Sequence, residues 1–220
     1  MVSPGLTSRH TRREDSQTLL ALQARIYPDI PPWPQRRFEH QLEVFPQGQL
    51  TAEIDGEIVG CASGLIVLWD DWPVEHTWKE ITASGTFDTH NPKGRTFYGA
   101  EVFVDPHLRG YGLGHALDEA RRELCRRMNL KRIIACGRLP GYLQHAGEMS
   151  ADLYAMKGVW GDLNDPVLGF QLREGFRFCT VIPEYLPEDK ESCGNASLIV
   201  WLNPEFDPSQ PTRIPEGDVI

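Results

Sequence analysis

Thr96-Phe-Tyr-Gly-Ala-Glu-Val-Phe-Val-Asp-Pro-His-Leu-Arg-Gly-Tyr-Gly-Leu-Gly114 is the stretch that decides the fold. Its first part is rich in aromatic and β-branched side chains, which predicts a buried strand over 96–104. Pro106 ends the strand, because proline has no N–H to donate to a neighbouring strand. From Leu113 onward, apolar side chains recur at steps of three and four, which predicts a helix of about four turns up to Met128. The polar side of this helix is expected to hold His115, Asp118, Glu119, Arg121, Arg122 and Arg126.

A strand that passes through glycines into a helix is typical of a phosphate-binding turn. The glycines stand at 110, 112 and 114, and they let consecutive backbone N–H groups approach one ligand. The helix start adds unpaired N–H groups and the positive end of the helix dipole. A Walker A loop is excluded, since Gly-Lys-Ser/Thr is missing, and a Rossmann turn is excluded, since the third glycine comes one residue early. A glycine-rich turn that binds nothing stays open as the other interpretation.

The turn resembles the acetyl-CoA loop of the GNAT N-acetyltransferases, whose pattern Val104, Pro106, Arg109, Gly112 and Gly114 match in register. The resemblance implies an α+β fold, with a mixed, mostly antiparallel sheet of about seven strands that splays between its fourth and fifth strands and is flanked by helices. It also implies acetyl-CoA as the cofactor. The residues implied in cofactor binding are Phe103, Val104, Arg109, Gly110, Tyr111, Gly112, Leu113, Gly114, Asn164 and Gln171.

The last predicted helix, at 164–174, carries a second part of the same pattern. Asn164, Gly175 and Phe176 stand at the spacing of the family, and glycine suits the left-handed position after a helix end. Where many members of the family have a tyrosine near the CoA sulfur, this sequence has Gln171. An amide can donate a hydrogen bond but cannot give up a proton. A general acid must therefore come from another residue, or the thiolate leaves unaided.

Several further strings resemble one branch of the family, the acetyltransferase domain that bacteria often fuse to a nitrilase-type carbon–nitrogen hydrolase. They lie at 100–106, 137–142, 149–150, 165–171, 189–192 and 201–204. The likeness covers most of residues 6–204 and implies a free-standing version of this module. The partners expected from it are a small-molecule amine, a separately encoded hydrolase and a second copy of the chain.

The chain is expected to form one domain over 1–204, with a helical insertion at 139–160 and a proline-rich tail at 205–220. Everything from Asn203 onward is expected to be poorly ordered. Asp55-Gly56 predicts a two-residue hairpin turn, and 69–95 predicts a long excursion with one short helix. Periodicity predicts other helices at 14–26, 35–45 and 150–157, and other strands at 6–12, 49–54, 57–69, 131–137, 177–182 and 196–201.

Composition narrows the class of protein. The formal net charge is −9 and basic runs are absent, which argues against nucleic acid and anionic membranes as partners. The five cysteines lack metal-ligand spacing and suit buried thiols in a reducing compartment. Neither a secretory signal nor an apolar run long enough to span a membrane is recognisable. We therefore expect a cytoplasmic protein without a metal site.

Glu101 is the expected general base, because burial among apolar neighbours raises the pKa of a carboxyl group toward neutrality. The other interpretation is a structural carboxylate that pairs with an arginine. The N–H of Val104 is implied as the donor that polarises the thioester oxygen. For the general acid Tyr142 is preferred, with Tyr154 and Tyr185 as alternatives.

The sequence therefore predicts an acetyl-CoA-dependent N-acetyltransferase that acts on the amine of a small molecule. Two other functions stay open: an acyl-CoA-binding sensor without activity, which Gln171 favours, and an acetyltransferase for proteins. A small acceptor is favoured if 69–95 and 139–160 both fold over the splay. The resemblance places the acceptor beside the first two helices, where the wall residues, or plain packing residues, are Tyr27, Trp33 and Phe38.

Overall fold

The computed structural model describes residues 5–27 and 33–215. A seven-stranded sheet has the order β1-β2-β3-β4-β5-β7-β6. Its strands are β1 (Leu6–His10), β2 (Gln49–Ile54), β3 (Glu57–Val67), β4 (Thr96–Val104), β5 (Arg132–Arg138), β6 (Arg177–Ile182) and β7 (Ala196–Leu202). The helices are α1 (Ser16–Ile26), α2 (Gln35–Val44), α3 (Trp78–Ile81), α4 (Leu113–Arg127), α5 (Ala151–Trp160) and α6 (Pro166–Arg173). The predicted α+β fold class is confirmed.

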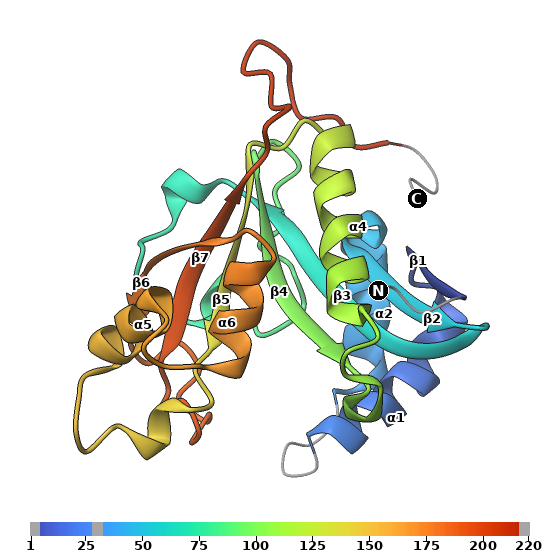
Figure 1. The fold of residues 1–220 in the computed structure, drawn as a ribbon. Helices are drawn as coiled ribbons and strands as arrows, with labels where there is room; N and C mark the ends of the chain where they lie inside the picture. Colours follow the sequence, from blue (N-terminus) through green and yellow to red (C-terminus); the bar gives the residue numbers. More distant parts are fainter. Residues whose placement is uncertain (1–4, 28–32, 216–220) are drawn as a thin grey trace.

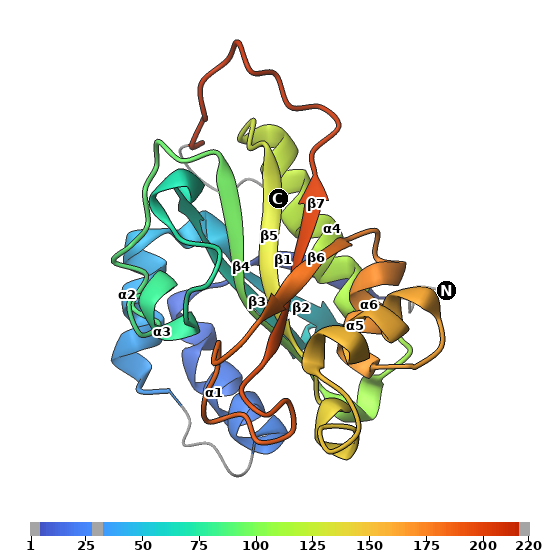
Figure 2. The same ribbon diagram turned by 90° about the vertical axis from the view of Figure 1, so that its left-hand side faces the viewer.

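The sheet lies between two layers of helices. Figure 2 shows α1, α2 and α3 on one side of the sheet and α4, α5 and α6 on the other. The central strand β3 is buried over most of its length, because helices cover both of its faces. The apolar face of α4 packs onto β2 and β3 through Leu113, Leu117 and Ala120, the first part of the predicted stripe.

The only parallel pair among the described strands is β4 with β5, and it is short. The register runs from Thr96 opposite Arg132 to Gly99 opposite Ala135, and it stops there although both strands continue. Beyond this point β4 stays paired with β3 and β5 stays paired with β7. The two strands therefore diverge into a gap, which Figure 1 shows as a V whose open end lies near the start of α4. This is the predicted splay.

The two long connections lie on different faces of the molecule. The segment 69–95 includes α3, as predicted, and lies on the side of α1 and α2 (Figure 2). The segment 139–160 includes α5, which begins after Ser150, whose Oγ accepts from the Leu153 N–H at 3.3 Å. Figure 1 shows α5 beside α6, away from the V. Of the two segments, only 69–95 therefore lies on the face of the sheet that α1 and α2 cover.

The predicted polar side of α4 needs a correction. Asp118, Arg121 and Arg122 are only 4%, 4% and 6% exposed. Periodicity assigned these residues to solvent because it cannot show that a second helix covers α4. Arg122 donates to the carbonyl of Glu174, the residue just after α6. Arg121 donates to the carbonyl of Ser63 on β3. Burial of these charges is possible because each guanidinium meets carbonyl and carboxylate oxygens.

The expectation of a poorly ordered tail is wrong for residues 203–215. Asn203 is 6% exposed, and its Nδ2 donates to the carbonyls of Cys125 and Leu130, at 3.3 and 2.8 Å. The Arg213 N–H donates to the Met128 carbonyl at 2.9 Å. The carbonyls at the end of a helix have no partner within the helix. The tail supplies partners at the end of α4, and this holds it in place; residues 216–220 lie outside the described residues.

Replacing Asn203 by alanine is expected to lower the free energy of unfolding by about 1–3 kcal/mol, since the buried Leu130 carbonyl loses its donor and the Cys125 carbonyl keeps only the Leu130 N–H. Urea unfolding measures the change. Gln210→Ala, at an exposed position of the same tail, is the matched control and should change stability by less than about 0.5 kcal/mol. Equal midpoints for the two variants would show that the tail does not stabilise the fold.

The cysteines differ in burial. All five are free; Cys61 and Cys125 are buried, whereas Cys179 and Cys193 are exposed, so the expectation of buried thiols is wrong for these two. Over 5–27 and 33–215, no helix has the length and apolar character to cross a membrane. Within the same ranges, no three side chains of His, Cys, Asp or Glu come together as a metal-binding group.

Candidate active site

The gap between β4 and β5 exposes backbone groups of β4. The Asp105 N–H donates to the Val59 carbonyl of β3 at 2.8 Å. Because N–H groups alternate in direction along a strand, the N–H of Val104 points away from β3, toward the gap that opens beyond Gly99. The predicted oxyanion donor therefore lies on the wall of the gap.

The glycine turn ends at the start of α4. Gly110 and Gly112 have φ of 87° and 85°, in the left-handed region that favours glycine. Gly112 precedes the helix, and its carbonyl accepts from the Ala116 N–H at 2.9 Å. The N–H groups of the three residues between them therefore have no partner within the helix. This first turn combines free donors with the positive end of the dipole of a 15-residue helix.

Helix α6 closes one side of the gap. A Cβ on Gly114 would lie 2.7 Å from the Phe170 ring, so glycine allows α4 and α6 to touch. The Gln171 amide lies against Gly137 on β5, where a Cβ would also collide. The Oε1 atom of Gln171 is buried and has no hydrogen-bond partner among the described residues. An unsatisfied buried oxygen beside an open strand edge is suited to a ligand that donates a hydrogen bond.

The other predicted cofactor residues fall into two groups. Arg109 and Tyr111 are exposed on the turn, and Asn164 is exposed just before α6, so all three side chains are free to meet a ligand. Phe103 and Leu113 are 7% and 2% exposed and belong to apolar clusters. Their side chains pack the fold, so any contact from them to a ligand is through the backbone.

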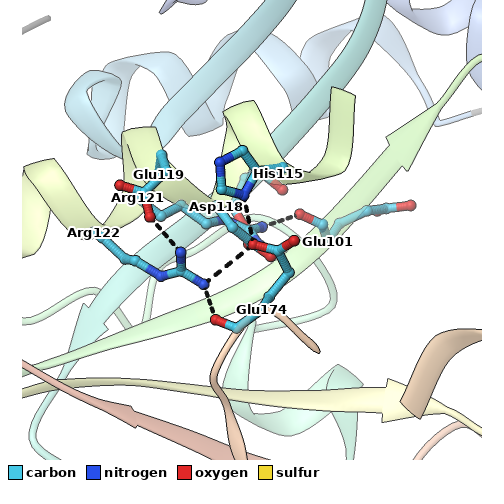
Figure 3. Close-up of polar contacts among 8 residues, drawn as sticks. Glu101, His115, Asp118, Glu119, Arg121, Arg122 and Glu174 are labelled. Carbon is cyan, nitrogen blue, oxygen red and sulfur yellow. Dashed lines mark hydrogen bonds and ion pairs between the residues drawn. The ribbon is translucent and has the colours of Figure 1, made fainter. Parts of the chain in front are cut away.

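A β-bulge places Glu101 beside the gap. Ser63 of β3 lies opposite Glu101, whereas the next residue, Gly64, lies opposite Gly99, so Ala100 is the extra residue. Arg121 spans this irregularity from α4. Its Nη2 donates to the carbonyl of Ser63 at 3.1 Å and to the carbonyl of Glu101 (Figure 3). The buried guanidinium thus binds carbonyl oxygens of both strands beside the bulge.

The side chain of Glu101 lies on the face opposite α4. Directly paired residues of antiparallel strands share a face, and Ser63, its partner, lines a pocket with Leu19 and Phe38 of α1 and α2. Burial raises the pKa of the Glu101 carboxyl group to about 8, against the opposing charges of Arg121 and Arg37. No described residue forms a hydrogen bond or an ion pair with the carboxylate, because Arg121 binds the carbonyl instead. This favours a base over a structural carboxylate.

The raised pKa predicts how Glu101 affects stability. Its folded pKa of about 8 lies above the ordinary value of 4.5, so the folded state binds more protons between these values. The contribution of Glu101 is therefore most favourable below pH 4.5, and it is lost as the pH rises to about 8. Tyr27, Cys61 and Tyr185 lie near it but stay neutral in this window, since burial raises the pKa of each.

Glu101→Gln removes this ionisation, so the variant is expected to gain stability relative to the wild type as the pH rises from 5 toward 8. Urea unfolding of both proteins at pH 5 and at pH 8.5 measures the difference, in which the titration of all other groups cancels. A stability difference that stays constant, or falls, with pH would contradict the raised pKa.

The tyrosines considered as acids lie in two places. The Tyr142 hydroxyl donates to the Met149 carbonyl at 3.1 Å, and its ring packs beside Tyr154, whose hydroxyl donates to Asp165 at 3.0 Å. Both belong to the core around α5 and α6. Tyr185 lies on the other face, 2.8 Å from the Tyr98 hydroxyl and near Glu101. The structure thus brings Tyr185, and not Tyr142, to the face that holds the Glu101 carboxylate.

A small pocket lies on that face, between α1, α2, β3 and β4. Its lining includes Trp33, Phe38 and Phe103, but not Tyr27. Sequence patterns did not single out Arg37, Arg121 or Trp78. Arg37 follows another arginine on a polar helix surface, and Arg121 stands on the predicted polar side of α4. Nothing in the sequence pattern separates either residue from ordinary surface charge.

Comparison with known proteins supports this geometry. A family model described as "Acetyltransferase (GNAT) family" matches residues 16–141. The chain is 41% identical over 205 residues to Probable hydrolase YhcX of Bacillus subtilis (strain 168), covering 93% of this chain but only 40% of YhcX. It is 37% identical over 204 residues to Uncharacterized N-acetyltransferase YkwB of the same organism, covering 90% of this chain and 89% of YkwB.

A solved structure shows the same fold. The GphF GNAT-like decarboxylase in complex with isobutyryl-CoA superposes with a TM-score of 0.76 at 23% identity, covering 89% of this chain and 98% of that chain. The family model extends over more than half of the sequence, and it includes the divergent strands, the glycine turn and α4. With a relative as similar as YkwB along nearly its whole length, the chain belongs to the acetyltransferase (GNAT) family of acyltransferases.

Proposed function

We propose that this chain transfers the acetyl group of acetyl-CoA directly to the amine of a small molecule, with Glu101 as the general base. The observation that carries the proposal is the state of the Glu101 carboxyl group. It has a pKa of about 8 and no ion pair among the described residues, and it lies beside the strand gap. A base with a pKa near the working pH accepts protons most effectively in a transition state.

The residues around the gap fit an acyl-CoA. The first turn of α4 offers free N–H groups for the pyrophosphate, and a Cβ on Gly110 would meet nothing within 4 Å, so the turn is open. Arg109 is exposed there and can add a charge-assisted contact. The orphaned Oε1 of Gln171 can accept a hydrogen bond from an amide of the pantetheine arm. Asn164, exposed before α6, stands on the same side of the gap.

Bound acetyl-CoA supplies the thioester whose carbonyl carbon is attacked. Glu101 takes a proton from the amine as the C–N bond forms, and the N–H of Val104 stabilises negative charge on the carbonyl oxygen. The C–S bond then breaks, and the products are the acetylated amine and CoA with a free thiol. The proton lost by the amine is balanced by the proton gained by the thiolate, so no other reactant is needed.

We assign the delivery of that proton to Tyr185. Its hydroxyl lies in a buried network with the Tyr98 hydroxyl and with Cys136, the residue of β5 immediately beyond the parallel pairing. Tyr142, the preferred acid of the sequence analysis, has its hydroxyl committed to the Met149 carbonyl. The Gln171 amide can assist by donating a hydrogen bond to the sulfur, although it cannot donate a proton.

The position of 69–95 supports a small acceptor. Trp78 in this segment donates from Nε1 to the Ala100 carbonyl at 3.0 Å, and from its backbone N–H to the Tyr185 carbonyl at 3.0 Å. These bonds hold the segment across the acceptor face, where an open peptide groove would otherwise run. The segment 139–160 lies elsewhere and covers no part of this face.

The test is a screen of amines with acetyl-CoA and detection of free thiol. The screen includes amino acids, polyamines and arylamines, and mass spectrometry identifies the acetylated product. We expect thiol release that depends on one class of amine. If the chain binds acetyl-CoA but no amine raises the release of free thiol above the rate of hydrolysis, the chain is an acyl-CoA-binding sensor and not an acetyltransferase for these amines. If free thiol is released only with peptides that carry a free N-terminus, the acceptor is a protein and not a small molecule.

The proposal includes a setting and a partner. We place the reaction in the cytoplasm, because five free thiols persist most readily under reducing conditions.

The chain covers only 40% of Probable hydrolase YhcX, so most of YhcX lies outside the region that the two proteins share. This supports a separately encoded hydrolase that works with the acetyltransferase. Affinity purification of the chain from its native cell, followed by identification of copurified hydrolases, tests the partnership.

A further inference from the structure

Arg37 on α2 is a guanidinium without a carboxylate partner. It is half-buried, and it lies over the Trp33 ring with its Cζ 5.6 Å from the ring centroid. Among the residues that the structure describes, no carboxylate forms an ion pair with it. Acidic residues outnumber basic ones by 31 to 22, and other arginines of the fold are paired, such as Arg25 with Asp105 at 2.7 Å. An unpaired guanidinium in this setting is available for a ligand.

Aromatic contacts tie Arg37 to the proposed base. The rings of Trp33 and Trp78 lie 5.9 Å apart, and the Trp78 indole donates to the carbonyl of Ala100, the residue just before Glu101. The Arg37 charge is close enough to act on the Glu101 carboxyl group, although no hydrogen bond joins them. The Arg37 guanidinium and the Glu101 carboxyl group therefore lie on the same side of the sheet, near each other but not in direct contact.

The pocket beside them is uncharged. It is lined by Leu19, Phe38, Phe103 and other apolar side chains, with Gln23, Gln41 and Ser63 as its polar members. The amide of Gln41 is already bonded to the Gly85 carbonyl at 2.7 Å, and that of Gln23 accepts from the Trp33 N–H at 3.0 Å. The pocket has a volume of about 10 Å³, which is room for one water molecule and not for a side chain of the acceptor.

We propose that the acceptor is an amino acid whose carboxylate binds Arg37 while its amine faces Glu101. A guanidinium fork matches a carboxylate with two parallel hydrogen bonds. The guanidinium would repel a simple amine, which carries a net positive charge in solution, whereas an amino acid is neutral overall. This inference rests on the proposed function and specifies its substrate class.

The experiment compares leucine with leucinamide, which has the same amine and side chain but no carboxylate. For the wild type, we expect acetylation of leucine with a lower KM than leucinamide. Arg37→Gln should raise KM for leucine by about 10- to 100-fold, the loss expected when a charge-assisted hydrogen bond is removed, and should not raise KM for leucinamide, which loses only the repulsion of its positive charge. Arg37→Lys should restore part of the preference. Arg36→Gln, at the exposed neighbouring position, is the matched control and should change neither value.

Two results would overturn the inference. An equal rise in KM, or an equal loss of kcat, for leucine and leucinamide in Arg37→Gln would mean that Arg37 acts on Glu101 or on the fold. A wild type that acetylates other amines but no amino acid would reject the substrate class and leave the acetyltransferase in place. A wild type that binds acetyl-CoA and acetylates no amine rejects the proposed function itself, and the amino acid acceptor with it.

Discussion

Replacing Glu101 by glutamine is expected to lower kcat for acetyl transfer by about 10²- to 10⁴-fold, the usual contribution of a general base. Glutamine keeps the size of the side chain but cannot accept a proton from the amine. The affinity for acetyl-CoA should stay the same, because the free N–H groups at the start of α4 do not involve this side chain. Steady-state kinetics of both proteins, with calorimetry for binding, measures the two quantities.

The pH profile makes the prediction for Glu101 sharper. Because its pKa is about 8, the wild-type rate should rise with pH up to about this value, as the carboxylate form becomes populated. The residual activity of Glu101→Gln should lack this rise. Glu57→Gln, an exposed carboxylate at the start of β3, is the control and should behave as the wild type does. An unchanged profile in Glu101→Gln would assign the ionisation to another group.

Gly112→Asp is expected to abolish stabilisation by acetyl-CoA. At a ligand concentration of about 100 times Kd, binding adds about 2.7 kcal/mol to the wild type, which corresponds to a rise in Tm of roughly 5–10 °C for a domain of this size. The aspartate places a negative charge at the helix start, where it repels the pyrophosphate and can itself accept hydrogen bonds from the free N–H groups. Thermal unfolding with and without acetyl-CoA measures the rise.

The hairpin between β2 and β3 provides the matched control for this variant. Gly56 has the same φ of 85° as Gly112, and a Cβ there would meet nothing within 4 Å. Gly56→Asp therefore introduces the same backbone strain and the same charge far from the turn. It should lose stability without losing the rise in Tm with acetyl-CoA. If acetyl-CoA raised the Tm of Gly112→Asp as much as it raises that of the wild type, this turn would not be the phosphate-binding site.

The sequence predicted the parts of the site that depend on local patterns. The strand 96–104 has the predicted bounds, α4 begins at the predicted Leu113, and Ser150 caps α5. Asp55 and Gly56 both have positive φ, as the two-residue turn requires. Each of these features is determined by residues close together in the chain, so periodicity, capping and turn rules apply to it directly.

The sequence could not predict the features that depend on packing between distant segments. Arg121 looks like a surface residue until α6 and the β-bulge are placed beside α4. Arg37 can be recognised as a candidate ligand-binding residue only once its contact with Trp33 and its position near Glu101 are known, and Glu101 is far away in the sequence. The tail looked disordered because its prolines and polar residues form no periodic pattern, yet it binds carbonyls at the end of α4.

Binding of acetyl-CoA to the glycine turn and the strand gap can be measured by a calorimetric titration of the wild-type chain. This experiment needs no acceptor. We expect one site per chain with Kd in the micromolar range, about −8 kcal/mol, and weaker binding of pantetheine, which lacks the phosphates. The absence of binding up to millimolar acetyl-CoA would contradict the cofactor assignment, and the glycine turn would then be only a structural connection.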